Sequence, residues 1–445
     1  MTAFSLEPEQ LAWCERLRTL AAKRLRPLAD KGDPGHVNRP LVAELGALGL
    51  LPRLFTSGAL DLCLMRESLA YACTEAETAL ALQGLGAHPV YAHGTEAQRA
   101  RWLPRVSDGT AVAAFALSEP TAGSDAAALA LRAAPTRARG AADETGAAGS
   151  RGIESGAEPA GPRDATDGTG TVGVPGASGP AGAGPRSGVR PDGAALAAEG
   201  DGRSAWRLTG EKCWISNAPE ADFYTVFART TPGAGARGVT AFLVPADRPG
   251  LSGTPLDMLS PHPIGALAFD AVPVTADDVL GEPDRGFRVA MGTLNLFRPS
   301  VGAFAVGMAT AALDATLAHT GARDAFGGKL RDLQTVSHQV AEMALRTEAA
   351  RLMVYAAATA YDENAPDVPR RAAMAKLLAT ETAQYVVDKA VQLHGARALQ
   401  RGHLLEHLYR EVRAPRVYEG ASEVQREIIA KELYRAQDTT GEAGA

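Results

Sequence analysis

The stretch FALSEPTAGSD, residues 115–125, decides the fold, because the hydrophobic pattern of the chain changes there. Before it, apolar residues recur at helical intervals. After it, short β-branched or aromatic runs alternate with Pro, Gly and Asp. The stretch opens on a strand-like Phe-Ala-Leu and continues as a hydroxyl-rich loop. Alone it fits an ordinary surface turn as well as a functional loop, since Pro, Gly, Ser and Asp favour turns.

Upstream of this stretch, residues 7–110 have the pattern of consecutive helices. Leu11, Cys14, Leu17 and Leu20 fall at three-residue steps, and residues 64–86 have the pattern of a further apolar-striped helix closed by glycine. The sequence therefore predicts an N-terminal helical domain over residues 1–111.

Downstream, the runs WRLTGEKCWISN, DFYTVFART and GVTAFLVP are bounded by turn residues and predict the strands of an antiparallel sheet or barrel. We expect this middle β domain over residues 112–285. Within it, residues 134–203 are rich in Ala, Gly, Pro, Arg and Asp and poor in large apolar side chains. Such a segment cannot bury enough surface to offset its ordering entropy, so we expect a disordered insertion.

Residues 286–436 return to a helical pattern with four long helices, which predicts a C-terminal four-helix bundle, and residues 437–445 are expected to form a flexible tail. The predicted fold class is α+β and multidomain, in the order helical, β, helical.

The composition argues against several classes of protein. A net charge of -6 and a pI near 5.9 provide no electrostatic reason to bind nucleic acid or an anionic membrane. The four cysteines are widely spaced and form no Cys-x-x-Cys pair, so neither a metal site nor a disulfide framework is expected. No stretch reaches about 18 uninterrupted apolar residues, and the N-terminus has no signal-peptide pattern. We therefore expect no membrane span and a cytoplasmic location.

Five motifs together resemble those of the acyl-CoA dehydrogenase family, flavoenzymes that introduce an α,β double bond into acyl thioesters. The resemblance covers nearly the whole chain apart from the inserted segment and the extreme tails, and the motifs occur in the family's order. They are ALSEPTAGSD (116–125), GEKCWISNA (210–218), RDAFGGKLRDLQTV (323–336), AVQLHG (390–395) and RVYEGASEVQREI (416–428).

The resemblance implies FAD as the cofactor and gives residues 115–125 a role. The strand that contains Phe115 is expected beside the isoalloxazine ring, with backbone contacts from Leu117 and the Ser118 hydroxyl at the N5 edge, where a donor stabilises the reduced ring. Gly123 and Ser124 are expected near the pyrophosphate or the pantetheine arm of the substrate, where only small residues leave room. Two acids in the loop, Glu119 and Asp125, are expected to fix its shape.

Other motifs imply further flavin contacts. Trp214 and Ser216 lie two apart on a predicted strand and should face the same side, where the resemblance has them stack along and hydrogen-bond to the ring. Arg323 and Phe326 resemble residues that reach the flavin of a neighbouring subunit, so a homodimer or homotetramer is expected; a solvated helix end is the alternative. The remaining cofactor-binding positions that the resemblance implies are Gln334, Gln392, Gly395 and Ala421.

Glu419 is the predicted general base. It precedes Gly420, which permits a turn that a Cβ would hinder, and Ser422 with Gln425 has the spacing of a capping box. Desolvation would raise the pKa of this carboxylate toward a useful range. Some family members place the base just before an arginine of the first C-terminal helix, but that position is Phe297 here. The alternative for Glu419 is a surface acid that favours a helix N-terminus.

Substrate contacts follow from the same resemblance. Arg298 would hold the pantetheine arm, although Asn295 stands where relatives often carry an acid. The backbone N–H of Glu419 and a ribityl hydroxyl would polarise the thioester carbonyl. The substrate-binding positions so implied are Ser124, Asn295, Arg298 and Gly420.

The implied function is FAD-dependent α,β-dehydrogenation of an acyl thioester on coenzyme A or a carrier protein. Glu419 would take the α-proton, flavin N5 the β-hydride, and an electron-transfer flavoprotein or similar acceptor the electrons. A flavin monooxygenase or oxidase on the same fold is one alternative. A catalytically silent flavin-fold partner protein is another, because Ala421 and Ala325 replace polar residues of the family motifs and Gly395 lacks the glycines that usually follow it.

Overall fold

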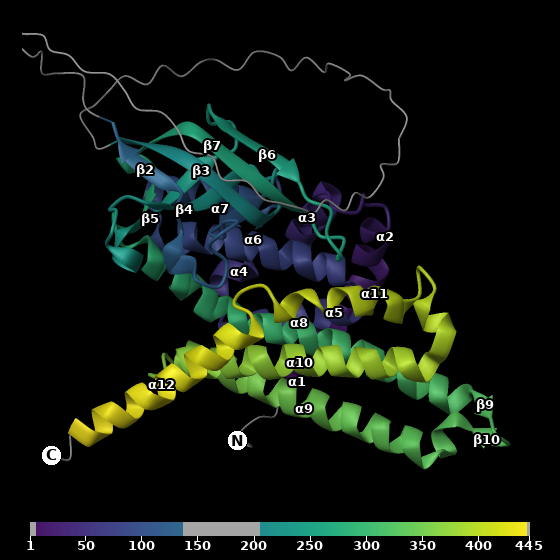
Figure 1. Cartoon of the computed structure of the whole chain (residues 1–445). Helices are drawn as coiled ribbons and strands as arrows, with labels where there is room; N and C mark the ends of the chain where they lie inside the picture. Colours follow the sequence, from purple (N-terminus) through teal and green to yellow (C-terminus); the bar gives the residue numbers. More distant parts are fainter. Residues whose placement is uncertain (1–5, 137–204, 443–445) are drawn as a thin grey trace, which may run out of the picture. The chain divides into compact units, whose positions relative to one another are not determined.

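The computed structural model describes residues 6–136 and 205–442, which belong to one compact unit. Its elements follow the predicted order helical, β, helical, which confirms the fold class (Figure 1). The predicted disordered insertion lies outside the described residues except at its start, residues 134–136, where Ala134 and Pro135 belong to a strand. Most of the predicted tail is helical, because the last helix continues to Glu442. The domain boundaries stay a prediction.

The N-terminal part contains helices throughout, and local sequence signals explain several of their ends. Helix α7 begins with a capping box, in which the Thr95 hydroxyl accepts from the Gln98 N–H (3.2 Å) and the Gln98 side chain accepts from the Thr95 N–H (2.7 Å). The helices are α1 Pro8–Leu20, continued by a π-helical turn at Ala21–Leu25, α2 Arg26–Ala29, α3 Arg39–Ala47, α4 Arg53–Thr56, α5 Ala59–Ala72, α6 Thr74–His93 and α7 Glu96–Ser107.

The prediction of one helix over residues 64–86 is wrong. Cys73 has an extended backbone (φ -158°, ψ 95°), so α5 ends before it and α6 begins after it, and α6 runs on to His93. Apolar periodicity continues on both sides of the break because both helices are buried, and periodicity alone therefore does not reveal it.

The middle part is an eight-stranded sheet in the order β6-β7-β3-β2-β4-β5-β8, with β1 paired to β4. Most pairs are antiparallel, whereas β1 and β2 each pair with β4 in parallel. The strands are β1 Ala113–Ala116, β2 Arg132–Pro135, β3 Ala205–Ser216, β4 Phe223–Arg229, β5 Val239–Pro245, β6 Leu251–Pro255, β7 Ile264–Thr275 and β8 Val279–Leu280.

The C-terminal part contains the four predicted long helices and one that the sequence pattern did not reveal, α11. A short hairpin of β9 and β10 joins α8 to α9 (Figure 1). The elements are α8 Gly286–Ala322, β9 Asp324–Ala325, β10 Gly328–Lys329, α9 Gln334–Asp362, α10 Val368–His394, α11 Leu404–Glu411 and α12 Ser422–Glu442.

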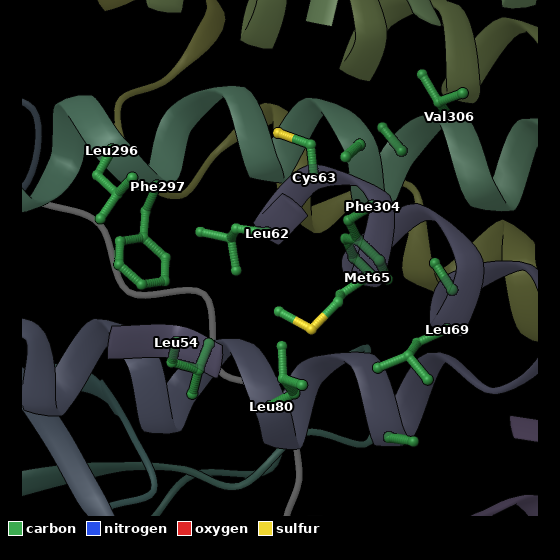
Figure 2. Packing of buried hydrophobic residues seen from close by; sticks show 14 of the residues in the cluster. Leu54, Leu62, Cys63, Met65, Leu69, Leu80, Leu296, Phe297, Phe304 and Val306 are labelled. Atoms are coloured by element: carbon green, nitrogen blue, oxygen red, sulfur yellow. The ribbon is translucent and has the colours of Figure 1, made fainter. Parts of the chain in front are cut away.

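Helix α8 organises the core. By length and composition it could cross a membrane, but 67% of its most apolar window is buried inside the protein, where it packs against α5, α9 and α10. Its apolar surface therefore contacts protein, as in the core helix of a soluble fold. Figure 2 shows Leu62 and Met65 of α5 between Leu80 of α6 and Phe297 and Phe304 of α8. The helices that precede the sheet in the sequence and those that follow it thus share one core.

The close approach of α8 to α5 requires glycine at position 307. A Cβ there would lie 2.4 Å from the Glu67 carbonyl oxygen and 2.7 Å from the Ala70 Cβ. We expect Gly307→Ala to lower the free energy of unfolding by about 1–3 kcal/mol through overpacking. Gly292 is the matched control, because it is exposed on the same helix with no atom within 4 Å. Gly292→Ala should stabilise by about 0.5–1 kcal/mol. Equal thermal unfolding midpoints for the two variants would contradict this account of the helix contact.

Candidate active site

A buried ion pair fixes the loop that follows β1. The Glu119 carboxylate accepts hydrogen bonds from the backbone N–H groups of Ala130 (2.5 Å) and Leu131 (2.9 Å) and from the Lys212 ammonium (2.8 Å). The same ammonium donates to the Leu117 carbonyl (2.8 Å). Glu119 and Lys212 are both buried. Glu119 therefore holds the loop, as expected, but its partner Lys212 on β3 was missed.

This loop lies beside the end of β3. The Cys213 N–H donates to the Ser118 carbonyl (3.0 Å), so Ser118 and Trp214 are neighbours in space. The register of β3 against β7 shifts between Lys212 and Ile215, and Trp214 has a left-handed backbone (φ 57°). This irregularity interrupts the regular alternation on which the prediction relied. Ile215 is nevertheless buried, whereas Trp214 is 48% exposed and Ser216 half-buried.

The other predicted residues of the first motif differ in accessibility. Phe115 is half-buried against Phe227, with ring centroids 4.9 Å apart, and Leu117 is buried. Gly123 and Ser124 are exposed in the loop, and a Cβ at Gly123 would have no atom within 4 Å. The space that the prediction requires around these two residues is therefore present in this chain.

Glu419 lies on a tightly held turn before α12. Its backbone is left-handed (φ 52°), and Gly420 follows with φ 93°. Arg298 donates to the Glu419 carbonyl (3.3 Å), Lys376 donates to the Gly420 carbonyl (2.7 Å), and the Gln425 side chain donates to both (3.2 and 2.9 Å). As a residue Glu419 is half-buried, but its Oε2 is buried and has no hydrogen-bond partner among the described residues. Such an unsatisfied group is uncommon and calls for an explanation.

Two effects shift the pKa of the Glu419 carboxyl group in opposite directions. Burial raises the pKa of its carboxyl group, while the positive charges of Arg66, Lys376 and Arg298 act in the other direction, and the pKa remains raised. A carboxylate with a raised pKa is a better proton acceptor than a solvated one. The site can therefore act as a general base.

The predicted capping box at the start of α12 is wrong. Ser422 is the first residue of the helix, and its hydroxyl donates to Glu381 of α10 (2.6 Å). The Gln425 side chain instead donates to the carbonyls of Glu419 and Gly420. Polar groups supplied by the tertiary structure compete with the local cap, and their positions cannot be deduced from a four-residue spacing.

Arg298, the residue predicted to hold the pantetheine arm, hydrogen-bonds to groups of the chain itself in this structure. It is buried and also donates to the Asn295 side chain (3.2 Å), so in this structure it supports the turn at Glu419. Phe297 belongs to the core: its ring would lie 2.8 Å from a Cβ at Gly84, and its centroid is 6.2 Å from that of His88. Burial and His93 lower the pKa of His88 to about 4.

A second group of predicted residues lies at the other end of α8. Phe326, at the tip of the β9–β10 hairpin, is 90% exposed with a left-handed backbone (φ 52°), and Arg323 beside it is exposed. The rings of His319 and His394 stack at 4.2 Å, which brings the ends of α8 and α10 together. Exposed residues of the motifs at this end also include Gln334, Gln392 and Gly395.

The two groups are far apart in one chain. Arg298 and Arg323 are separated by about 38 Å along α8, at a rise of about 1.5 Å per residue. The structure thus brings Ser118 together with Trp214, and brings Glu419 together with Gly420, Ala421, Asn295 and Arg298. The set around Glu419 lies far from the residues of the hairpin.

Sequence reasoning missed three charged residues at the site, namely Arg66, Lys212 and Lys376. A local signal existed for Arg66, which lies in a buried run of α5. Lys212 follows the exposed Glu211 and precedes the half-buried Cys213, so no local pattern marks it as buried. Within the described part of the chain no cluster of three or more His, Cys, Asp or Glu side chains could hold a metal ion, and the four cysteines are free thiols.

The chain is similar in sequence to three family models and to several known proteins. Family models for the N-terminal, middle and C-terminal domains of acyl-CoA dehydrogenase match residues 7–110, 183–272 and 284–434. The chain is 30% identical over 443 residues to a probable acyl-CoA dehydrogenase of Mycobacterium leprae, with 97% of each chain covered. It is 32% identical over 431 residues to the human mitochondrial short-chain specific acyl-CoA dehydrogenase, with 94% of this chain and 88% of the relative covered.

A solved structure, butyryl-CoA dehydrogenase from Megasphaera elsdenii, is also similar. It has a TM-score of 0.77 and 27% sequence identity, with 97% of this chain and 99% of that chain covered. The similarity thus extends over the helices on both sides of the sheet as well as the sheet itself.

Proposed function

The chain belongs to the acyl-CoA dehydrogenase family, and we propose that it catalyses FAD-dependent α,β-dehydrogenation of an acyl-CoA thioester with Glu419 as the general base. It is accordingly an oxidoreductase that acts on CH–CH groups. The observation that carries the proposal is the buried Oε2 of Glu419, which has no hydrogen-bond partner among the described residues although its turn is held by three side chains.

The residues present fit FAD. Trp214 has an exposed side chain next to Cys213, whose N–H binds the Ser118 carbonyl, and such an accessible indole suits the ring of a flavin. Arg323 and Phe326 offer a guanidinium and an aromatic face, which suit the pyrophosphate and the adenosine half. When bound, the flavin supplies an electron acceptor that takes the β-hydrogen with its electron pair.

We propose that Glu419 takes the α-proton of the thioester. Hydrogen bonds from Arg298 and Gln425 to its carbonyl hold the backbone, so that the carboxylate is positioned before the substrate arrives. Its backbone N–H would polarise the thioester carbonyl and thereby acidify the α-carbon. General base catalysis of this kind contributes roughly 10²- to 10⁴-fold in rate.

The separation along α8 supports an assembly of at least two copies. One flavin dinucleotide cannot span the distance from the Glu419 site to Arg323 and Phe326 of the same chain. We propose that these residues, with Gln334, Gln392 and Gly395, contact the flavin of a neighbouring copy, which would also cover the exposed Phe326 ring. An electron-transfer flavoprotein is the proposed electron acceptor, on the basis of family membership.

The test is an anaerobic titration of the FAD-loaded protein with a panel of acyl-CoA and acyl-carrier-protein thioesters, followed by flavin absorbance. We expect at least one saturated acyl-CoA to bleach the flavin and to be recovered as the α,β-unsaturated thioester. If only carrier-protein thioesters bleach the flavin, the substrate is an acyl-carrier-protein thioester and not an acyl-CoA. Oxygen-dependent turnover without any anaerobic bleaching by thioesters would favour the monooxygenase or oxidase, and no reaction at all would favour a silent partner protein.

A further inference from the structure

A buried charge pair lies close to the Glu419 turn and takes no part in the function proposed above. Arg66 of α5 donates through Nε to the Glu77 carboxylate of α6, and through Nη1 to the Ser300 hydroxyl of α8 (2.6 Å). Ser300 in turn donates to the Phe297 carbonyl (2.7 Å). Arg66, Glu77 and Ser300 are all buried. Three helices therefore hold one guanidinium in a defined position.

Burial of such a pair is a poor way to gain stability. Desolvation of two ions often offsets their attraction, and apolar residues of similar volume are commonly as stable or more stable. The Phe304 ring also faces the Arg66 guanidinium, with its centroid 6.0 Å away. The pair therefore calls for a role beyond holding α5 to α6.

The charge of Arg66 acts on Glu419. Among the cations near this carboxylate Arg66 has the largest influence, ahead of Lys376 and Arg298, although these two bind the backbone of the turn directly. Reciprocally, burial disfavours the charged guanidinium, while Glu77 and then Glu419 raise the pKa of Arg66. Through Ser300, Arg66 binds α8 two residues from Arg298, which donates to the Glu419 carbonyl. Yet none of the described residues donates a hydrogen bond to the Glu419 Oε2, so Arg66 does not close an ion pair there.

We infer that Arg66 is a positioning residue for the base: its guanidinium favours the charged form of Glu419, while Glu77 and Ser300 hold it back from binding that carboxylate. A guanidinium bound directly to Glu419 would occupy the lone pairs that must accept the proton, since Arg–carboxylate pairs are commonly bidentate. A cation held at a short remove keeps the carboxylate ionised and leaves those lone pairs free. The inference rests on the proposed role of Glu419.

The charged groups around Glu419 can be distinguished by the pH range in which each of them titrates. Arg66 faces it from α5, Arg298 from α8 and Lys376 from α10, and Tyr418 precedes it in sequence. Burial lowers the pKa of Lys376 to about 8, so it titrates on the alkaline side, and the two arginines stay charged throughout. Glu77 is the second acid near Arg66. The acidic limb of the pH profile should therefore report Glu419, with Glu77 tested by its own variant.

Two variants should move this acidic limb in opposite directions. Arg66→Met removes an attraction for the carboxylate, so the apparent pKa should rise by about one unit. Because Arg66→Met alone leaves the Glu77 charge buried, the double variant Arg66→Met/Glu77→Met is the safer form of the test. Glu77→Gln frees Arg66 to approach Glu419, so the apparent pKa should fall and the maximal rate should drop about tenfold. Arg66→Lys should restore most of the wild-type limb.

The measurement is the rate of anaerobic flavin reduction by the best acyl-CoA across pH, with circular dichroism of each variant to check folding. Arg351→Met is the matched control, because Arg351 pairs with Glu67, the next residue on α5. It should leave the acidic limb unchanged. A wild-type limb in the double variant would overturn the inference if Glu419→Gln is inactive. An active Glu419→Gln would instead refute the proposed base, whatever the Arg66 variants do.

Discussion

Glu419→Gln is expected to reduce the flavin with acyl-CoA at a rate at least about 10²-fold below that of the wild type, because an amide cannot accept the α-proton. The fold should persist, since Arg298, Lys376 and Gln425 bind the backbone of the turn and glutamine has nearly the same shape as glutamate. The rate is measured by stopped-flow absorbance under anaerobic conditions at saturating thioester.

Glu423→Gln provides the control for this experiment. Glu423 is an acid on the first turn of α12, and its side chain is 80% exposed. Its replacement should leave the rate of flavin reduction near that of the wild type, because a solvated acid contributes little to a buried site. If Glu419→Gln and Glu423→Gln reduce the flavin equally fast, another group must be the base.

Lys212→Met is expected to cause the largest loss of stability, about 3–5 kcal/mol, because it leaves the Glu119 carboxylate buried without its cation. The two backbone N–H groups of Ala130 and Leu131 remain as its partners, but they carry no full charge. The loop that presents Ser118 should loosen first, because Lys212 binds the Leu117 carbonyl before Ser118 and the Glu119 carboxylate after it.

Urea unfolding followed by circular dichroism measures this effect. Arg346→Met is the comparison, because Arg346 and Glu342 form an exposed i,i+4 pair on α9 that should contribute no more than about 0.5 kcal/mol. Lys212→Met combined with Glu119→Gln should recover part of the loss, since no unpaired charge then remains buried. A Lys212→Met variant as stable as Arg346→Met would show that the pair is dispensable.

Several features of the site were predictable from short stretches of sequence. The Glu-Gly step at residues 419 and 420 indicated a turn with unusual backbone angles, and both residues have positive φ. The acid of the first motif was expected to hold its loop, and Glu119 does so. Each of these depends on residues that are adjacent in the chain. The contact of Arg323 and Phe326 with the flavin of a neighbouring copy stays a prediction from the resemblance.

Other features depend on partners that are distant in sequence. Glu119 lies in the loop after β1 and Lys212 on β3, while Arg66 lies on α5, Glu77 on α6 and Glu419 on the turn before α12. The sequence around any one of these charged residues does not indicate which other charged residue will be buried beside it. The capping box at Ser422 failed for the same reason, because Glu381 of another helix binds the hydroxyl.

By itself the sequence determined the order helical, β, helical, because hydrophobic periodicity is a local property of each segment. It also determined the residue types available for proton transfer and flavin contact. The tertiary structure alone decided which charges are buried together, that α8 shares a core with the N-terminal helices, and that the hairpin end lies far from Glu419. The physical reason is that burial and electrostatic pairing depend on distances in space, which form only when remote segments pack against one another.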